Sequence, residues 1–239
     1  MSDRPPFAVT VDLAVFTVRG GVFCVLLVER GGEPFAGSWA LPGGFVEPDE
    51  DAEAAAWREL REETGVDRFE GHLEQLRTYS APGRDPRMRV VSVAHVAFAP
   101  DLPEPQPGSD AAGARWWAVE DVLDDGPDAP VLAFDHAEIL EDARERVCAK
   151  LEYTTLAREL VAEPFSLPEL RQVYAAVWGA PPDLGTFRRK VLGTEGFLEP
   201  VERTERSAVR LYRRGTATAI QPPLLRVTAS PPEAPPSPP

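Results

Sequence analysis

A chain of 239 residues, 43% of them hydrophobic, is long enough for one large domain or two modest ones, each with a real core. Its two cysteines, Cys24 and Cys148, exclude a disulfide framework, and the lack of a signal-like leader or a membrane-length apolar run predicts a cytoplasmic protein with no membrane partner. The net charge of −14 is unevenly spread: residues 1–149 hold 13 Lys and Arg against 29 Asp and Glu, whereas residues 184–214 hold 8 against 4. This asymmetry favours different partners for the two halves, although ordinary surface charge would also produce it.

The first half alternates short apolar runs with loops and helical segments. Apolar, β-branched runs on either side of Gly20 and Gly21 predict a hairpin, and a Gly- and Pro-rich loop over 31–49 leads into a helix over 50–64. The later elements are predicted in this order: strands over 71–80, 87–99 and 114–119, a helical turn over 120–123, and a charged helix from His136 to about Lys150. Together they predict an α+β domain over residues 1–148.

The second half has a different pattern, with more helix and more positive charge. A helix is predicted over Tyr153–Ala162, and Ser166 with Glu169 forms a capping box that begins the next one. Asp183 caps a third helix, which runs through Leu192. Two short strands over 197–201 and 208–213 follow, and this order is that of a winged helix-turn-helix over residues 149–220. The Pro-dominated segment 221–239 is predicted to be disordered.

Three carboxylates on the first predicted helix are the strongest chemical feature of the sequence. Glu59, Glu62 and Glu63 stand at positions i, i+3 and i+4, so that they share one helix face and repel one another unless a cation lies between them. Hard divalent cations such as Mg²⁺ or Mn²⁺ take oxygen ligands of this kind. Arg58 is placed to orient the carboxylates, and Gly43 could add a backbone carbonyl to the metal ligands. An acidic, solvated helix face is the alternative interpretation.

The spacing of these residues resembles the Nudix box without any departure. From Gly44, five residues lead to Glu50 and seven more to the segment Arg58-Glu-Leu-Arg-Glu-Glu-Thr-Gly-Val66. The resemblance implies a Nudix fold, with a mixed sheet between helices, and hydrolysis of a diphosphate-linked nucleotide. It implies that Glu59 and Glu63 are the main metal ligands, assisted by Glu62 and Glu50. A domain that keeps the box only to bind a ligand remains an alternative. The expected site has catalytic residues Arg58, Glu59, Glu62 and Glu63, metal ligands Gly43, Glu59, Glu62 and Glu63, and ligand-binding residues Gly44, Glu50, Arg87 and Arg89.

Basic residues gather in the predicted winged helix. A helix with basic residues can enter the major groove of DNA, while wing arginines contact phosphates or the minor groove. A solubilising surface or a protein-binding surface would also be basic. The candidate DNA-binding residues are Arg188, Arg189 and Lys190 in the third helix, and Arg206, Arg210 and Arg213 around the wing.

A second resemblance covers about residues 7–214. The segments 150–155, 163–167, 187–190 and 211–213, which follow the acidic Nudix-like half, are similar to those of Nudix-related transcriptional regulators of NAD metabolism. That resemblance implies a homodimer that binds a double-stranded operator and is released by ADP-ribose or a related nucleotide. Many such regulators have eroded boxes, whereas this box is intact, so that retained hydrolysis is also expected. The alternative is a dedicated ADP-ribose pyrophosphatase whose C-terminal domain serves dimerisation.

Overall fold

The computed structural model describes residues 6–108, 111–124, 126–202 and 209–226. Within these ranges, seven strands form one mixed sheet with the order β3-β2-β1-β6-β5, to which β4 adds against β1 and β7 against β2. β1 pairs antiparallel with β2 and parallel with β6. The strands of this sheet are β1 (Ala8–Arg19), β2 (Val22–Arg30), β3 (Trp39–Ala40), β4 (Gly43–Phe45), β5 (His72–Tyr79), β6 (Val90–Phe98) and β7 (Ala111–Ala118).

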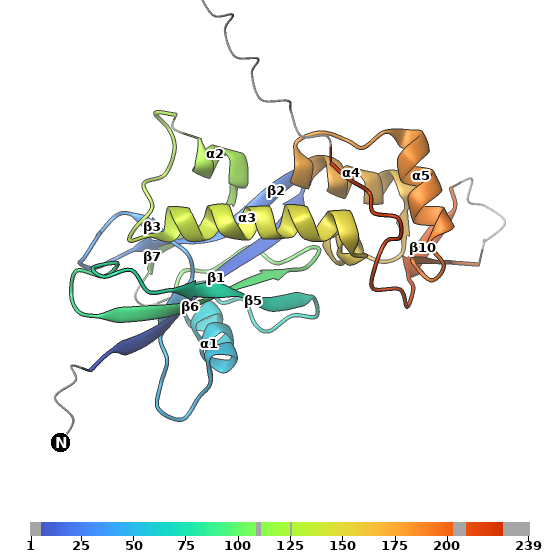
Figure 1. Cartoon of the computed structure of the whole chain (residues 1–239). Helices are drawn as coiled ribbons and strands as arrows, with labels where there is room; N and C mark the ends of the chain where they lie inside the picture. Colours follow the sequence, from blue (N-terminus) through green and yellow to red (C-terminus); the bar gives the residue numbers. More distant parts are fainter. Residues whose placement is uncertain (1–5, 109–110, 125, 203–208, 227–239) are drawn as a thin grey trace, which may run out of the picture.

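Helices cover both faces of the sheet because the side chains of its central strand are buried on both sides. Along β1, Val11 and Leu13 belong to a cluster with Leu60 of α1 (Ala52–Thr64), whereas Phe16 packs in the cluster that contains Ile139 of α3 (His136–Tyr153). Alternate residues of a strand point to opposite faces, which is how one strand serves two cores. α1 and α3 accordingly lie on opposite sides of the sheet, with the short helix α2 (Val119–Leu123) beyond β7 (Figure 1).

The second domain is a winged helix that packs against the far end of α3. It contains the 3₁₀ helix η1 (Leu156–Leu160), β8 (Phe165–Ser166), α4 (Leu167–Trp178), α5 (Leu184–Gly193), β9 (Leu198–Pro200) and β10 (Leu211–Arg214). Ser166 and Glu169 form the predicted capping box, and Asp183 caps α5 by accepting a hydrogen bond from the Thr186 N–H. The three short strands pair in the order β8-β10-β9. The α+β fold with a C-terminal winged helix is therefore confirmed.

Two segments differ from the sequence expectation. The helix predicted over 153–162 is instead the last residue of α3 followed by η1, because Thr154 has extended backbone and its hydroxyl donates to the Lys150 carbonyl oxygen, where it ends α3. Residues 221–226, which were predicted to be disordered, pack against the domain instead. Leu224 is buried, and its N–H donates to the Glu152 carbonyl oxygen. Residues 227–239 lie outside the described residues.

No helix in the described part of the chain combines the length and the apolar character needed to cross a bilayer.

Candidate functional site

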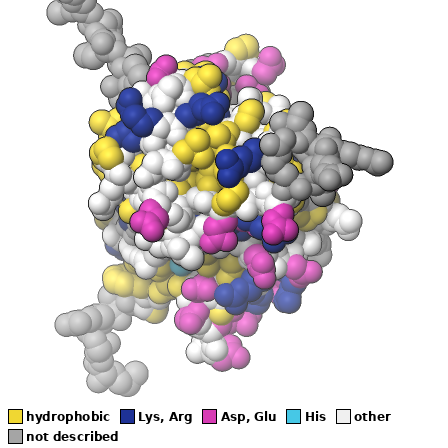
Figure 2. All heavy atoms as spheres, turned by 90° about the vertical axis from the view of Figure 1, so that its right-hand side faces the viewer, with side chains coloured by type: hydrophobic (Ala, Val, Ile, Leu, Met, Phe, Trp, Pro, Cys, Tyr) yellow, Lys and Arg dark blue, Asp and Glu magenta, His cyan; other side chains and the backbone are white. Residues whose placement is uncertain are grey.

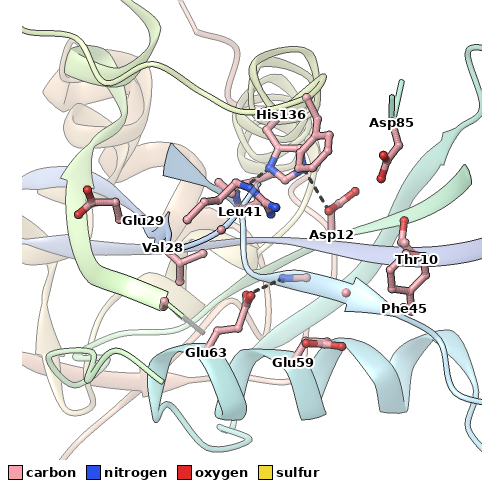
Figure 3. A pocket seen from close by; sticks show the side chains of 18 of the residues that line it. Thr10, Asp12, Val28, Glu29, Leu41, Phe45, Glu59, Glu63, Asp85 and His136 are labelled. Carbon is pink, nitrogen blue, oxygen red and sulfur yellow. Dashed lines mark hydrogen bonds and ion pairs between the residues drawn. The ribbon is translucent and has the colours of Figure 1, made fainter. Parts of the chain in front are cut away.

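The carboxylates of the box are carried by a helix whose two ends are fixed locally. Asp51 accepts a hydrogen bond from the Ala54 N–H at the start of α1, and Gly65 ends the helix in the left-handed conformation with φ 67°. Ala55, Ala56 and Leu60 bury one side of the helix against the sheet. Glu59 and Glu63, one turn apart, face β4 and the loop before it (Figure 3). The amphipathic pattern of α1 therefore determines where these two acids point.

The two acids enter a cavity of about 700 Å³ between α1, β1, β2, β4 and the N-terminal end of α3. A volume of this size fits a nucleotide-sized ligand. The lining includes Thr10, Asp12, Arg30, Gly43, Gly44, Phe45, Glu59, Glu63, Arg84, Asp85, Arg87, Phe134 and His136.

Gly43 and Gly44 lie in the segment 41–50 that leads into α1 (the box loop), where Gly43 packs closely against β1 and Gly44 against Glu59 of α1. A β-carbon on Gly44 would lie 2.2 Å from the Glu59 Oε1 atom, and one on Gly43 would lie 2.2 Å from the Val11 carbonyl oxygen. The Gly43 contact is with backbone and excludes a side chain at that position, whereas a side chain at position 44 would push the Glu59 carboxylate out of its place. The Gly43 N–H donates to the Glu63 Oε2 atom at 3.0 Å, which ties the loop to the helix (Figure 3).

Arg58 holds the remaining carboxylates of the box in a fixed arrangement. Its guanidinium donates twice to Glu50, with N···O distances of 3.1 and 2.6 Å, and once to Glu59 at 2.8 Å. It also reaches Glu62 at 3.3 Å and the Phe45 carbonyl oxygen at 3.0 Å. The hydrogen bond with Arg58 lowers the pKa of Glu50, and its partners raise the pKa of Arg58. Glu50 and the half-exposed Glu62 do not line the cavity, so the structure brings Glu59 and Glu63, but not these two, to its interior.

Glu63 is an acid that lacks a strong cationic partner. Burial raises its pKa to about 8, and the neighbouring carboxylates of Glu59 and Asp12 act in the same direction, against the Gly43 hydrogen bond and Arg30. Burial also raises the pKa of Glu59, despite its contact with Arg58. Two adjacent buried acids with this preference for neutrality would be ionised by a divalent cation placed between them.

The donor set at this point fits a hard cation of the magnesium type. Among the described residues no group of three His, Cys, Asp or Glu side chains is already arranged around a common point. The set instead consists of the carboxylates of Glu59 and Glu63, with Gly43 hydrogen-bonded to Glu63 through its N–H, and such cations keep part of their shell as water. Soft nitrogen or sulfur donors are not part of it.

Of the two arginines expected to bind ligand, only one lies at the cavity. Arg87 lines it, held by Asp85 through N···O distances of 3.0 and 2.7 Å, with its guanidinium over the rings of Phe45 and Phe134. Arg89 is outside the lining and donates to the carbonyl oxygens of Ser80, Ala81 and Val90 instead. It holds the turn before β6, so the structure gives it a local structural role.

A polar cluster that includes Asp12, Arg84 and His136 of the cavity lining was not anticipated from the sequence. Arg84 donates to Asp135 at 2.8 and 2.6 Å and to Asp12 at 3.1 Å, and the Arg84 and Asp12 side chains are 5% and 8% exposed. Ser92 also donates to Asp12, and the Nε2 atom of His136 lies 3.3 Å from it. Burial alone would raise the pKa of Asp12, but His136, Ser92 and Arg84 outweigh it and lower the pKa to about 2.

His136 connects this cluster to the box loop and to α3. Its Nδ1 atom accepts a hydrogen bond from the Leu41 N–H at 2.9 Å, two residues before Gly43, and His136 is the first residue of α3 (Figure 3). The His136 side chain also lines the cavity.

The basic residues of the winged helix fall into two groups. Arg188 and Arg189 are exposed on α5, and Arg210 and Arg213 are exposed at the wing, whereas Lys190 is half-buried. Arg214, the last residue of β10, is paired with Glu159 at 3.0 Å and donates to the Arg158 carbonyl oxygen. Arg206 lies outside the described residues.

Comparison with known proteins agrees with this two-part arrangement. Residues 6–142 match the NUDIX domain, and residues 157–213 match the NrtR DNA-binding winged helix domain. The ADPR responsive transcriptional repressor NtrR of Acinetobacter baylyi is 34% identical over 217 residues, which are 89% of this chain and 84% of the relative. An ADP-ribose pyrophosphatase of Methanocaldococcus jannaschii is 40% identical over 120 residues, which are 49% of this chain and 64% of the relative.

A solved structure of Shewanella oneidensis NrtR in complex with a 27mer DNA is similar over nearly the whole chain. It has a TM-score of 0.70 and 34% sequence identity, and the similarity covers 86% of this chain and 93% of that one. Both domains and their order are therefore shared with a protein of that kind. The chain belongs to the Nudix superfamily and, within it, to the NrtR-like transcriptional regulators, in which a NUDIX domain precedes a DNA-binding winged helix.

Proposed function

We propose that this chain is a cytoplasmic repressor that binds a double-stranded operator as a homodimer and is released by ADP-ribose or a related nucleotide. The observation that carries the proposal is the position of α3. Its first residue, His136, lines the cavity, and its last turns support the winged helix: the Trp178 indole N–H donates to the Cys148 carbonyl oxygen at 3.2 Å, and the Ile220 N–H donates to Tyr153 at 2.9 Å. An 18-residue helix spans about 27 Å, so one rigid element joins the two candidate sites.

Such an arrangement gives ligand binding a route to the DNA-binding domain. A ligand shifts the operator affinity only if it binds the free and DNA-bound states with different affinity, and the effect is then reciprocal. The box loop, His136 and α3 are joined by the Leu41–His136 hydrogen bond, and a nucleotide that alters the loop would act on the end of the helix. The relative that is named ADPR responsive supports ADP-ribose as the first candidate.

The test is operator binding with and without nucleotide. The full chain is used to select a DNA site in vitro, and its affinity for that site and for scrambled DNA is measured by fluorescence anisotropy, with and without ADP-ribose. We expect a salt-dependent preference for the selected site that ADP-ribose weakens at least fivefold. Equal affinity for both DNAs, or no response to a panel of ADP-sugars and dinucleotides, would overturn the repressor proposal.

Replacing Arg188 and Arg213 together by alanine is expected to weaken operator binding. Both side chains are exposed, and we propose that both contact phosphates, so their loss should lower the affinity for every DNA sequence and reduce the slope of log K against log salt by about 2. Anisotropy titrations at several salt concentrations measure both quantities. Arg61→Ala removes an exposed charge from α1 in the other domain and should leave the slope unchanged; an unchanged slope in the double variant would contradict the assignment.

We further propose that the NUDIX domain retains hydrolase activity. Glu59 and Glu63, with the Gly43 carbonyl, would hold Mg²⁺ or Mn²⁺, which neutralises a diphosphate and activates water when bound. Arg58 orients Glu59, and Arg87, which also lines the cavity, would bind a phosphate of the ligand. The matching box and the pyrophosphatase relative support this activity. A dedicated ADP-ribose pyrophosphatase with a dimerising winged helix is the second candidate, favoured by turnover without operator binding.

A further inference from the structure

The outward side of α5 is defined by what the helix buries. Phe187 and Val191 are 0% and 1% exposed, and the Phe187 ring packs edge-on against Tyr174 of α4 with 5.7 Å between centroids. At 100° per residue, Arg189 lies directly opposite these two side chains, and Gly185 and Leu192 lie beside it. Arg189, Leu192 and the two neighbouring glycines are therefore the first groups that a partner approaching α5 would meet.

The glycines of α5 have no role inside the domain. A β-carbon on Gly193 would meet no atom within 4 Å, and one on Gly185 would come no nearer than 3.5 Å, to the Asp183 side chain. Neither has a left-handed φ, so alanine would fit at both positions. Glycine costs about 0.5–1 kcal/mol relative to alanine in the middle of a helix, and the cost is smaller here because Gly185 is the second residue of α5 and Gly193 its last. Two such residues in a ten-residue helix, on the side that faces outward, point to a partner whose surface comes close to the helix backbone.

Between the glycines, α5 exposes two charged side chains, Arg188 and Arg189, and one apolar side chain, Leu192. Arg189 makes no hydrogen bond or ion pair with the described residues, and Leu192 is 47% exposed. Arg188 stands next to them, and Figure 2 shows hydrophobic side chains lying between Lys and Arg side chains on this end of the molecule. The surface therefore has cationic side chains around the apolar Leu192. Cationic side chains are complementary to the phosphates that border the major groove, and an apolar side chain is complementary to the methyl group of thymine within it.

We propose that Leu192 contacts a thymine methyl group in the operator and so specifies an A·T pair beside the base that Arg189 reads. The inference rests on the proposed operator binding and adds the base type at one position. Arginine reads guanine through its two acceptors in the major groove, whereas an apolar side chain distinguishes thymine by its methyl group alone. The two residues are less than one helical turn apart, so the bases they read are neighbours in one half-site.

The experiment removes the methyl group without changing base pairing. In the site selected with the full-length chain, each thymine of a half-site is replaced in turn by deoxyuridine, and affinities of the wild type and of Leu192→Ala are measured at one salt concentration. We expect one thymine whose replacement weakens wild-type binding roughly fourfold, the effect of a single buried methyl group. The same replacement should have no further effect on Leu192→Ala.

Leu184→Ala is the matched control. Leu184 is as exposed as Leu192, at 53%, but it lines a groove between α4 and α5, so this variant should keep the wild-type response to deoxyuridine. Loss of the response in both variants, or an unchanged response in Leu192→Ala, overturns the assignment, as does a half-site in which no thymine matters. If the wild-type chain selects no DNA at all, the proposed operator binding is wrong. If it selects a site but Leu192→Ala keeps the wild-type response to deoxyuridine, only the assignment of Leu192 is wrong.

Discussion

Glu63→Gln is expected to reduce the metal-dependent hydrolysis of ADP-ribose by about 10²–10³-fold, the loss typical of removing one preorganised electrostatic group. Glutamine retains an oxygen that can accept the Gly43 N–H, so the contact between the box loop and α1 survives, while the negative charge that would hold the cation is lost. Release of AMP from ADP-ribose in the presence of Mg²⁺ measures the effect. In the absence of metal at neutral pH, the variant should unfold at a temperature no lower than the wild type, because no packing contact is removed and the raised pKa of Glu63 means that its buried charge costs stability there.

Glu62→Gln is the control for the effect of Glu63→Gln on hydrolysis. Glu62 is on the same helix and reaches Arg58 at 3.3 Å, but its side chain is 53% exposed and outside the cavity lining. Its replacement should reduce turnover by less than about tenfold, which is below the loss of about 10–100-fold typical of groups that support metal ligands. Equal losses in both variants would place Glu62 in the metal shell. A wild-type chain without turnover would leave the domain as a sensor and would end the hydrolase proposal.

Operator release gives Glu63→Gln a second measurement. If the chain is both a sensor and a hydrolase, the variant destroys its inducer more slowly, so ADP-ribose should keep it off the operator for longer than the wild type at equal starting concentration. The time course of anisotropy after one addition of ADP-ribose measures this difference. Identical time courses would indicate that hydrolysis has no part in the regulation.

The helix of the box was predictable because its information is local. The capping residue Asp51, the terminating Gly65 and the spacing of Glu59 and Glu63 all lie within 15 residues, and the helix bounds differ from the prediction by two residues. The winged helix was predictable for the same reason, since Ser166, Glu169 and Asp183 cap their own helices. Neither Arg89 nor Arg214 could be assigned in this way, because their partners are carbonyl oxygens and carboxylates that the sequence spacing does not reveal.

The polar cluster of Asp12, Arg84, Ser92, Asp135 and His136 is the largest part of the site that the sequence analysis missed. Its members come from β1, the turn before β6, β6 itself and the start of α3, and Arg84 and Asp135 are 51 residues apart. The sequence pattern predicts the segments that contain these residues without giving the residues a role. Asp12 interrupts an apolar strand, and Arg84 lies in a turn rich in charged residues. Only the pairing of β1 with β6 and the position of α3 bring them together, and both are properties of the whole sheet.

Arg84→Ala is therefore expected to destabilise the domain by about 3–5 kcal/mol, which is the cost of leaving buried charges without their partner. The variant would leave Asp135 without its two hydrogen bonds from Arg84 and would leave Asp12 with Ser92 and His136 alone. Chemical denaturation followed by far-UV circular dichroism measures the free energy of unfolding. The loss is a large fraction of the stability of a typical domain, so ADP-ribose binding should weaken as well.

Arg77→Ala is the control for this prediction, since Arg77 also pairs with two carboxylates, Glu138 and Asp142, but its side chain is 50% exposed. Water screens such a pair, and its loss should cost about 1 kcal/mol or less. Arg84→Lys keeps the charge but cannot donate to both oxygens of Asp135 in the same geometry, so its stability should lie between those of the wild type and Arg84→Ala. If Arg84→Ala loses no more stability than Arg77→Ala, the cluster does not hold β1, β6 and α3 together, and the route from the box loop to α3 would have to depend on the Leu41–His136 hydrogen bond and apolar packing.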